Sequence, residues 1–242
     1  MSDSINVYWG SCNEGFLEMS KSMWYRDPSN VYKRHANNKN ADVPDNGTTM
    51  FMCPAVQDKL KNTWSFESAA NVEIIIRDGI IESNSGIPLH PTPRQNSIDD
   101  TGHIWIDLGW LFFADQPLVA SFTSPYFDRV DHVSKMSIPP AAFDIGSWFR
   151  PFNAEYIVWN IENTDINLVE GDPLFYVEFM TDKKVNLVRF EQSPKILEYA
   201  TGCSKSTQFF GRGRGLDKRY LDFDAGHMRE LILREIQKNV VG

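Results

Sequence analysis

Residues 143–180 read FDIGSWFRPFNAEYIVWNIENTDINLVEGDPLFYVEFM, and this stretch decides the fold class. It contains three runs with the character of β-strands. Each run is either rich in β-branched or aromatic residues or alternates between apolar and polar positions. The runs cover 154–159, 166–168 and 174–180, and the polar turns between them cover 162–165 and 170–172. Pro173, which lacks an N–H group, is tolerated on an edge strand. We therefore predict a three-stranded antiparallel unit here.

Three short segments of this stretch carry a resemblance to a known superfamily. They are the turn Phe143-Asp144-Ile145-Gly146, the strand end Val158-Trp159-Asn160, and the segment from Ile166 to Leu174. Together they resemble the core of the dUTPase and dCTP-deaminase superfamily, in which an Ile-Asp-x-Gly turn precedes a strand ending in Trp-Asn or Tyr-Asn. The resemblance implies a β-clip-like fold of antiparallel strands.

The same resemblance implies a role for Asp144. In those enzymes a carboxylate near this turn contacts the nucleotide sugar or orients a hydrolytic water, so Asp144 is the candidate catalytic residue of a nucleotide-acting hydrolase or deaminase. The alternative is a structural Asp that accepts a hydrogen bond from its own backbone two residues on. Mg²⁺ would be the cofactor of the nucleotide enzyme, and otherwise we expect no cofactor.

A glycine-rich basic run near the C-terminus is the candidate ligand-binding segment. Residues 209–220 read FFGRGRGLDKRY and contain Arg212, Gly213, Arg214 and Gly215. Glycine lets backbone N–H groups approach an anion closely, and the guanidinium fork matches phosphate. The run resembles the glycine-rich arm with which dUTPases close their site. The alternative is an ordinary solvated surface loop.

A third group of candidates combines histidine and aspartate in the middle of the chain. Its members are His90, Asp99, Asp100, His103 and Asp107. The spacing contains no His-x-Asp facial pair of the kind that binds iron, so we predict no metal site. His35, His132 and His227 have no partner by spacing, and we interpret them as surface or structural residues.

A second resemblance spans more of the chain. The order Cys53-Pro54, Trp64, Ser124-Pro125 and then Gly-Asp-Pro-Leu at 171–174 is similar to an uncharacterised family found in bacteria and phages. The similar region is 50–219, and it implies no particular activity.

The length of 242 residues allows one sizeable core. We expect a single mainly β domain over 1–242, β-clip-like or a sandwich or barrel, followed by a C-terminal helix. Within it we expect an aromatic-rich segment and Asn-rich loop at 1–49, a β core at 50–200, and a Gly/Arg loop and helix at 201–242. Asp78-Gly79 predicts a two-residue hairpin turn, and apolar residues at helical spacing predict a helix over 225–240.

Composition excludes several classes of protein. A net charge of −8 argues against a general nucleic-acid binder, because phosphate binding draws its affinity from Lys and Arg. No apolar run reaches the roughly 20 residues of a membrane span, and the N-terminus lacks a secretory pattern. We expect a cytoplasmic location, or the host cytoplasm or virion for a viral protein. Cys12, Cys53 and Cys203 are expected to be thiols.

Two functions compete on these grounds. The favoured one is a non-catalytic interaction or assembly protein, phage-encoded and oligomeric, that binds copies of itself or another protein. The alternative is the nucleotide-acting hydrolase or deaminase, which requires Asp144 and the Arg212 region of the same or a neighbouring subunit to converge on one pocket.

Overall fold

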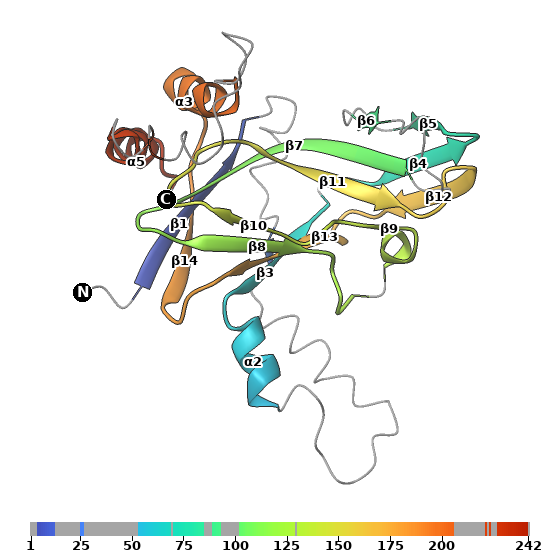
Figure 1. The fold of residues 1–242 in the computed structure, drawn as a ribbon, viewed down its shortest axis with the longest axis horizontal. Helices are drawn as coiled ribbons and strands as arrows, with labels where there is room; N and C mark the ends of the chain where they lie inside the picture. The colour runs from blue at the N-terminus through green and yellow to red at the C-terminus, as the bar shows by residue number, and fades with distance from the viewer. Residues whose placement is uncertain are drawn as a thin grey trace.

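The computed structural model describes residues 4–12, 25–26, 53–68, 70–84, 89–92, 102–128, 130–205, 221, 223 and 227–241. Three β-sheets and a group of helices make up this part of the chain (Figure 1). The predicted class, mainly β and antiparallel with a C-terminal helix, is confirmed. Cys12, Cys53 and Cys203 carry thiols and form no disulfide, as expected.

The largest sheet has six strands. Its order is β14 (Lys184–Arg189), β1 (Ser4–Ser11), β7 (Gly102–Ala114), β11 (Phe152–Val158) and β9 (Met136–Ser137), and β6 (Leu89–Thr92) also pairs with β7. Among the described pairs, β1 and β14 run parallel and the others run antiparallel.

The second sheet has five strands and the third has three. The five-stranded order is β10 (Ala141–Asp144), β8 (Val119–Thr123), β13 (Pro173–Phe179), β3 (Thr63–Glu67) and β2 (Tyr25–Arg26), with α2 (Pro54–Leu60) before β3. The three-stranded order is β12 (Asn163–Leu168), β4 (Val72–Arg77) and β5 (Ile80–Ser83). Asp78 and Gly79 join β4 to β5 with φ of 50° and 75°, so the hairpin prediction is confirmed.

The main core is built from alternate residues of all three sheets. Along β4, Val72, Ile74 and Ile76 are buried while the residues between them are more exposed. Aromatic rings dominate the centre, where Phe66 stacks on Phe175 at 5.3 Å between ring centroids. Because each strand contributes its inward face, burial of apolar surface holds the three sheets together.

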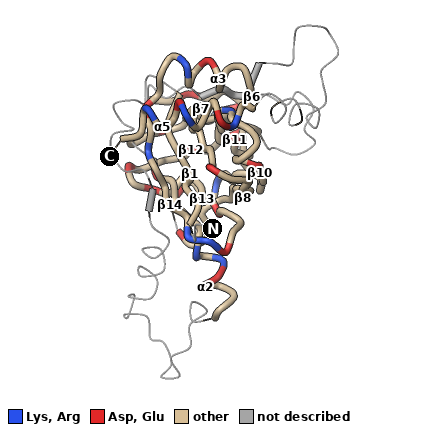
Figure 2. Tube along the Cα trace, turned by 90° about the vertical axis from the view of Figure 1, so that its left-hand side faces the viewer, with Lys and Arg blue, Asp and Glu red and all other residues tan. Residues whose placement is uncertain are grey.

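A second core forms where the helices cover the six-stranded sheet. The helices α3 (Pro194–Lys205) and α5 (Met228–Lys238) lie together on it, at the end of the molecule opposite α2 (Figures 1 and 2). Ile196 of α3 and Ile232 of α5 are fully buried against Leu111 and Phe113 of β7. The predicted C-terminal helix is thus confirmed with shorter bounds, and it packs on its own chain.

Two features of the fold differ from the sequence-based expectation. The strands predicted as one antiparallel unit exist as β11, β12 and β13, but each belongs to a different sheet. That prediction of pairing is wrong. Alternation of apolar and polar residues determines which face of a strand is buried, but it does not determine which strand it pairs with. Helix α3 was not predicted, although Ser193 caps its first turn through Oγ, which accepts a hydrogen bond from Ile196 N–H at 3.2 Å.

No helix among the described residues combines the length and apolarity that crossing a membrane requires.

Candidate functional site

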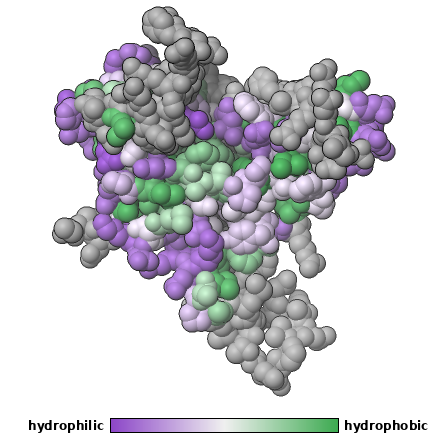
Figure 3. All heavy atoms as spheres, in the orientation of Figure 1, coloured by the Kyte–Doolittle hydropathy of each residue, from purple (hydrophilic) through white to green (hydrophobic). Residues whose placement is uncertain are grey.

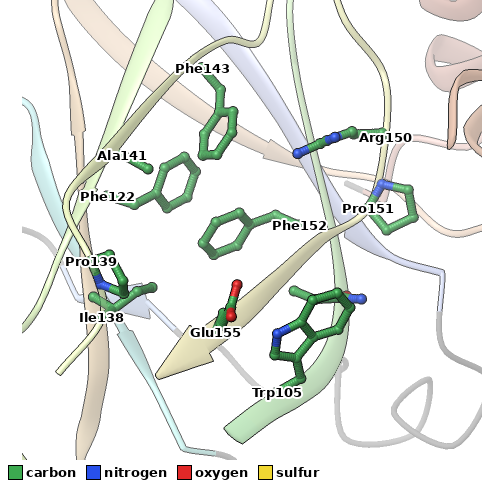
Figure 4. A pocket seen from close by; sticks show the side chains of 11 residues that line it. Trp105, Phe122, Ile138, Pro139, Ala141, Phe143, Arg150, Pro151, Phe152 and Glu155 are labelled. Carbon is green, nitrogen blue, oxygen red and sulfur yellow. The ribbon is translucent and has the colours of Figure 1, made fainter. Parts of the chain in front are cut away.

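A pocket of about 530 Å³ opens where the chain passes from one sheet to another. β9 lies at the edge of the six-stranded sheet and β10 at the edge of the five-stranded sheet, and residues 138–140 connect them. β9 pairs with Ile157 and Val158 at the end of β11, and Phe152, Asn153 and Glu155 in the first half of β11 line the opening. The lining residues are Trp105, Phe122, Ile138, Pro139, Ala141, Phe143, Arg150, Pro151, Phe152, Asn153 and Glu155 (Figure 4).

Three phenylalanine rings form the apolar wall of the pocket. Phe122 stacks on Phe152 with 4.0 Å between the centroids, and Phe143 meets both rings edge-on at 5.5 and 6.0 Å. Phe122 is almost fully buried, whereas Phe143 and Phe152 are half-buried. Apolar residues gather in the middle of this face of the molecule, over β8 and β10 (Figure 3). The pocket therefore reaches from the surface to the main core.

Polar and amphipathic side chains lie around this wall. The Trp105 side chain is 41% exposed although its neighbours Ile104 and Ile106 are buried, because it lies on the outer face of β7. The guanidinium carbon of Arg150 lies 5.6 Å from the centre of the Phe143 ring, which is a cation–π contact. Glu155 Oε1 lies 2.8 Å from His103 Nδ1, and this pair anchors the carboxylate.

Asn153 lies at an irregularity in the pairing of β11 with β7. Phe152 pairs with Trp110 and Ala154 with Ile106, so residues 107–109 of β7 stand opposite Asn153 alone. Gly109 takes a positive φ of 57°, a conformation that suits glycine. Bulges of this kind re-aim side chains and are common beside binding sites. Within the described part of the chain, the buried amide oxygen of Asn153 has no hydrogen-bond partner.

Asp144, the candidate catalytic residue, lies at the end of β10 beside this pocket. It lines a smaller cavity of about 30 Å³ that shares five lining residues with the larger one: Phe122, Phe143, Arg150, Pro151 and Phe152. Its Oδ1 accepts a hydrogen bond from Gly146 N–H at 2.9 Å, which is the bond of a structural turn.

The turn that contains Asp144 also explains why residue 146 is a glycine. A Cβ on Gly146 would lie 2.4 Å from the backbone oxygen of Gln116, so only glycine fits there without a shift of the main chain. Asp144 is therefore held firmly, with one oxygen already engaged.

Of the other residues that the sequence analysis named, some lie outside the described residues and some lie on strands. Arg212, Gly213, Arg214 and Gly215 lie outside the described residues, as do Asp99 and Asp100, so the predicted convergence of Asp144 with the Arg212 region stays a prediction. His90 lies on β6 and Asp107 on β7. His103 contacts Glu155, and among the described side chains no three His, Cys, Asp or Glu residues are grouped as a metal site requires.

Sequence reasoning did not identify Trp105, Arg150, Asn153 or Glu155 as site residues. A signal existed for Trp105, which occupies the solvent-facing position between two buried isoleucines of β7. No comparable signal marks Arg150, Asn153 and Glu155, because the pocket arises from strands of two sheets that meet only in the folded chain.

No family model matches this chain, and a search of curated proteins found no match. Both resemblances noted in the sequence therefore stay predictions.

Proposed function

We propose that this protein is a non-catalytic interaction protein and that its aromatic pocket receives a ring-containing group of its ligand. One observation carries the proposal: an exposed Trp105 and three packed phenylalanine rings line a single opening between two sheets. A tryptophan left half in solvent beside an apolar wall offers contact area that a ligand can bury.

The size and lining of the pocket support this function. Small-molecule sites typically have volumes of roughly 300–1,000 Å³ and combine an apolar lining with a few placed polar groups. The volume here is about 530 Å³, and the charged residues in its described lining are Arg150 and Glu155. The pocket is thus built like a binding site.

The polar side chains of the pocket are better suited to binding a ligand than to catalysing a reaction. The amide of Asn153 and the guanidinium of Arg150 can hydrogen-bond a ligand, but neither is an ordinary general acid or base. The carboxylate of Glu155 could play such a part, but it contacts His103 through one oxygen. This set of side chains fits binding without turnover.

Ligand-observed NMR with three ring compounds, indole, phenol and benzimidazole, tests the proposal. We expect saturation transfer to at least one of them, a strong decrease in Trp105→Ala, and an unchanged signal in Trp159→Ala. Trp159 is a matched control, because it is 50% exposed and does not line the pocket. Equal binding by both variants, or no binding by these three compounds or by any other ring-containing compound tested, would refute the proposal.

The nucleotide-acting enzyme remains a second candidate because of one observation. Asp144 and Arg150 line the same small cavity beside the aromatic pocket. A nucleotide whose base lay on the phenylalanine rings would bring its sugar or phosphates towards these two side chains.

This second candidate is tested by incubating the protein with dUTP and dCTP, with and without Mg²⁺, and measuring phosphate release and deamination. Activity that disappears in Asp144→Asn would establish it. Asparagine keeps the oxygen that accepts the Gly146 N–H bond, so the variant should fold normally. An inactive wild-type protein would eliminate the candidate.

A further inference from the structure

We infer that the ligand of the aromatic pocket is a neutral saccharide. The inference rests on the proposed binding function and names the chemical class of the ligand. It follows from the balance of charge in the pocket, the position of Trp105 relative to Glu155, and the hydrogen-bonding groups left available.

The charge of the pocket favours a neutral ligand. Arg150 supplies one positive charge and Glu155 one negative charge, and no other lining residue that the structure describes is charged. The whole chain carries −8, so an anionic ligand meets net repulsion from the protein and a single guanidinium for attraction. Tight phosphate sites use several donors or cations. A neutral ligand needs none of these.

Trp105 and Glu155 form a flat surface with an acceptor at its edge. The two residues are Cα partners in the pairing of β7 with β11, so their side chains project side by side from the same face of the sheet. Figure 4 shows the indole ring and the carboxylate next to each other, with the phenylalanine rings on the other side of the carboxylate. A sugar ring has an apolar C–H face that packs on an aromatic ring, and hydroxyl groups at its edge that would reach the carboxylate.

The available hydrogen-bonding groups match hydroxyls. Among the described residues, Glu155 contacts His103 through Oε1 alone. Its second carboxylate oxygen can accept a hydrogen bond from a ligand. Arg150 presents N–H donors and needs an acceptor. A hydroxyl group donates and accepts, so a polyhydroxylated ring can hydrogen-bond both Glu155 and Arg150, whereas a plain aromatic hydrocarbon can hydrogen-bond neither.

The experiment is a titration of the full chain with glucose, galactose, N-acetylglucosamine, cellobiose and maltose, followed by saturation-transfer NMR and by calorimetry. We expect at least one sugar to bind. Its affinity should fall about tenfold or more in Trp105→Ala, through loss of the stacking face. Trp105→Phe keeps an aromatic face and should retain most of the affinity. Trp159→Ala should bind like the wild type.

The outcomes separate this inference from the proposed function. If indole, phenol or benzimidazole binds in the pocket and none of the five sugars does, the saccharide inference is wrong and the binding function stands. If neither set binds, both are wrong. If dUTP or dCTP displaces the bound ring compound and the sugars do not, the ligand is a nucleotide. Thermal unfolding of each variant shows whether a loss of binding reflects loss of the fold.

Discussion

His132 is the residue whose burial has the clearest consequence for stability. It lies in the 3₁₀ helix η4 (Asp131–Ser134) and is 1% exposed, which agrees with its interpretation as a structural residue. Burial lowers the pKa of the His132 imidazole, because the charged form loses its hydration. Asp172, the backbone of Pro173 and Asp131 partly offset this effect. The neutral form is therefore favoured in the folded protein.

A pH dependence of stability follows from this lowered pKa. In the unfolded chain the imidazole takes up a proton near its ordinary pKa of 6.5, while the folded protein resists protonation. The contribution of His132 is therefore complete above about pH 6.5 and is lost progressively as the pH falls towards the lowered folded-state pKa. Urea unfolding at several pH values between 8 and 5 should show this decrease.

Two variants identify the residue responsible. His132→Gln cannot titrate, so we expect a shallower fall in the free energy of unfolding over the same pH range. His227→Gln, at an exposed position, should keep the slope of the wild type. Equal slopes in the wild type and in His132→Gln would show that burial of this imidazole does not set the dependence.

At the scale of elements, helix α5 shows how an amphipathic segment is held. Ile232 and Ile236 are fully buried, and Leu231 on the neighbouring side is 38% exposed. Val240, just past the helix, forms an isolated β-bridge with Phe190. The apolar stripe of the helix and the bridge together fasten the C-terminal segment to the six-stranded sheet.

Ile232→Ala should lower the free energy of unfolding by about 2–5 kcal/mol, because it removes buried methylene groups and leaves a cavity. Leu231→Ala is the control from the same helix and should cost much less, since its side chain is partly in solvent. Chemical denaturation of both variants measures the difference. A loss that depended on protein concentration would contradict the packing of α5 on its own chain, because only an intermolecular contact responds to concentration.

At the scale of the whole molecule, several large apolar side chains remain at the surface outside the pocket. Among them are Ile80 at 65% exposed, Met180 at 59%, Val169 at 53% and Trp159 at 50%. Single exposed apolar residues are normal, and each of these offers a small area that a second copy or a partner can cover.

We predict that the protein forms a homo-oligomer. The sequence analysis led to the same expectation, because it favoured an oligomeric assembly protein. Closed symmetric assemblies are the commonest form of such association. Light scattering coupled to size-exclusion chromatography should give a multiple of the 27.8 kDa chain mass. A mass of one chain at every concentration would eliminate self-association and leave a different protein as the partner.

The amino-acid sequence by itself determined most of the local structure. The β-branched run of β4, the Asp78-Gly79 turn and the apolar stripe of α5 were all predictable, because each depends on neighbours within a few residues. The turn bond of Asp144 was foreseen as one of two alternatives for the same reason.

Only the tertiary structure decided which strands pair and where the pocket lies. β11, β12 and β13 follow one another in the chain yet enter three sheets, and β14 pairs in parallel with β1 from the other end of the chain. The periodicity of a strand shows which face is buried. Its pairing partner depends on contacts with residues distant in sequence, which form only when long loops close and the core assembles. Trp105, Phe122, Phe143 and Glu155 come from four different strands, so their meeting in one pocket is a property of the packed sheets and leaves no local pattern in the sequence.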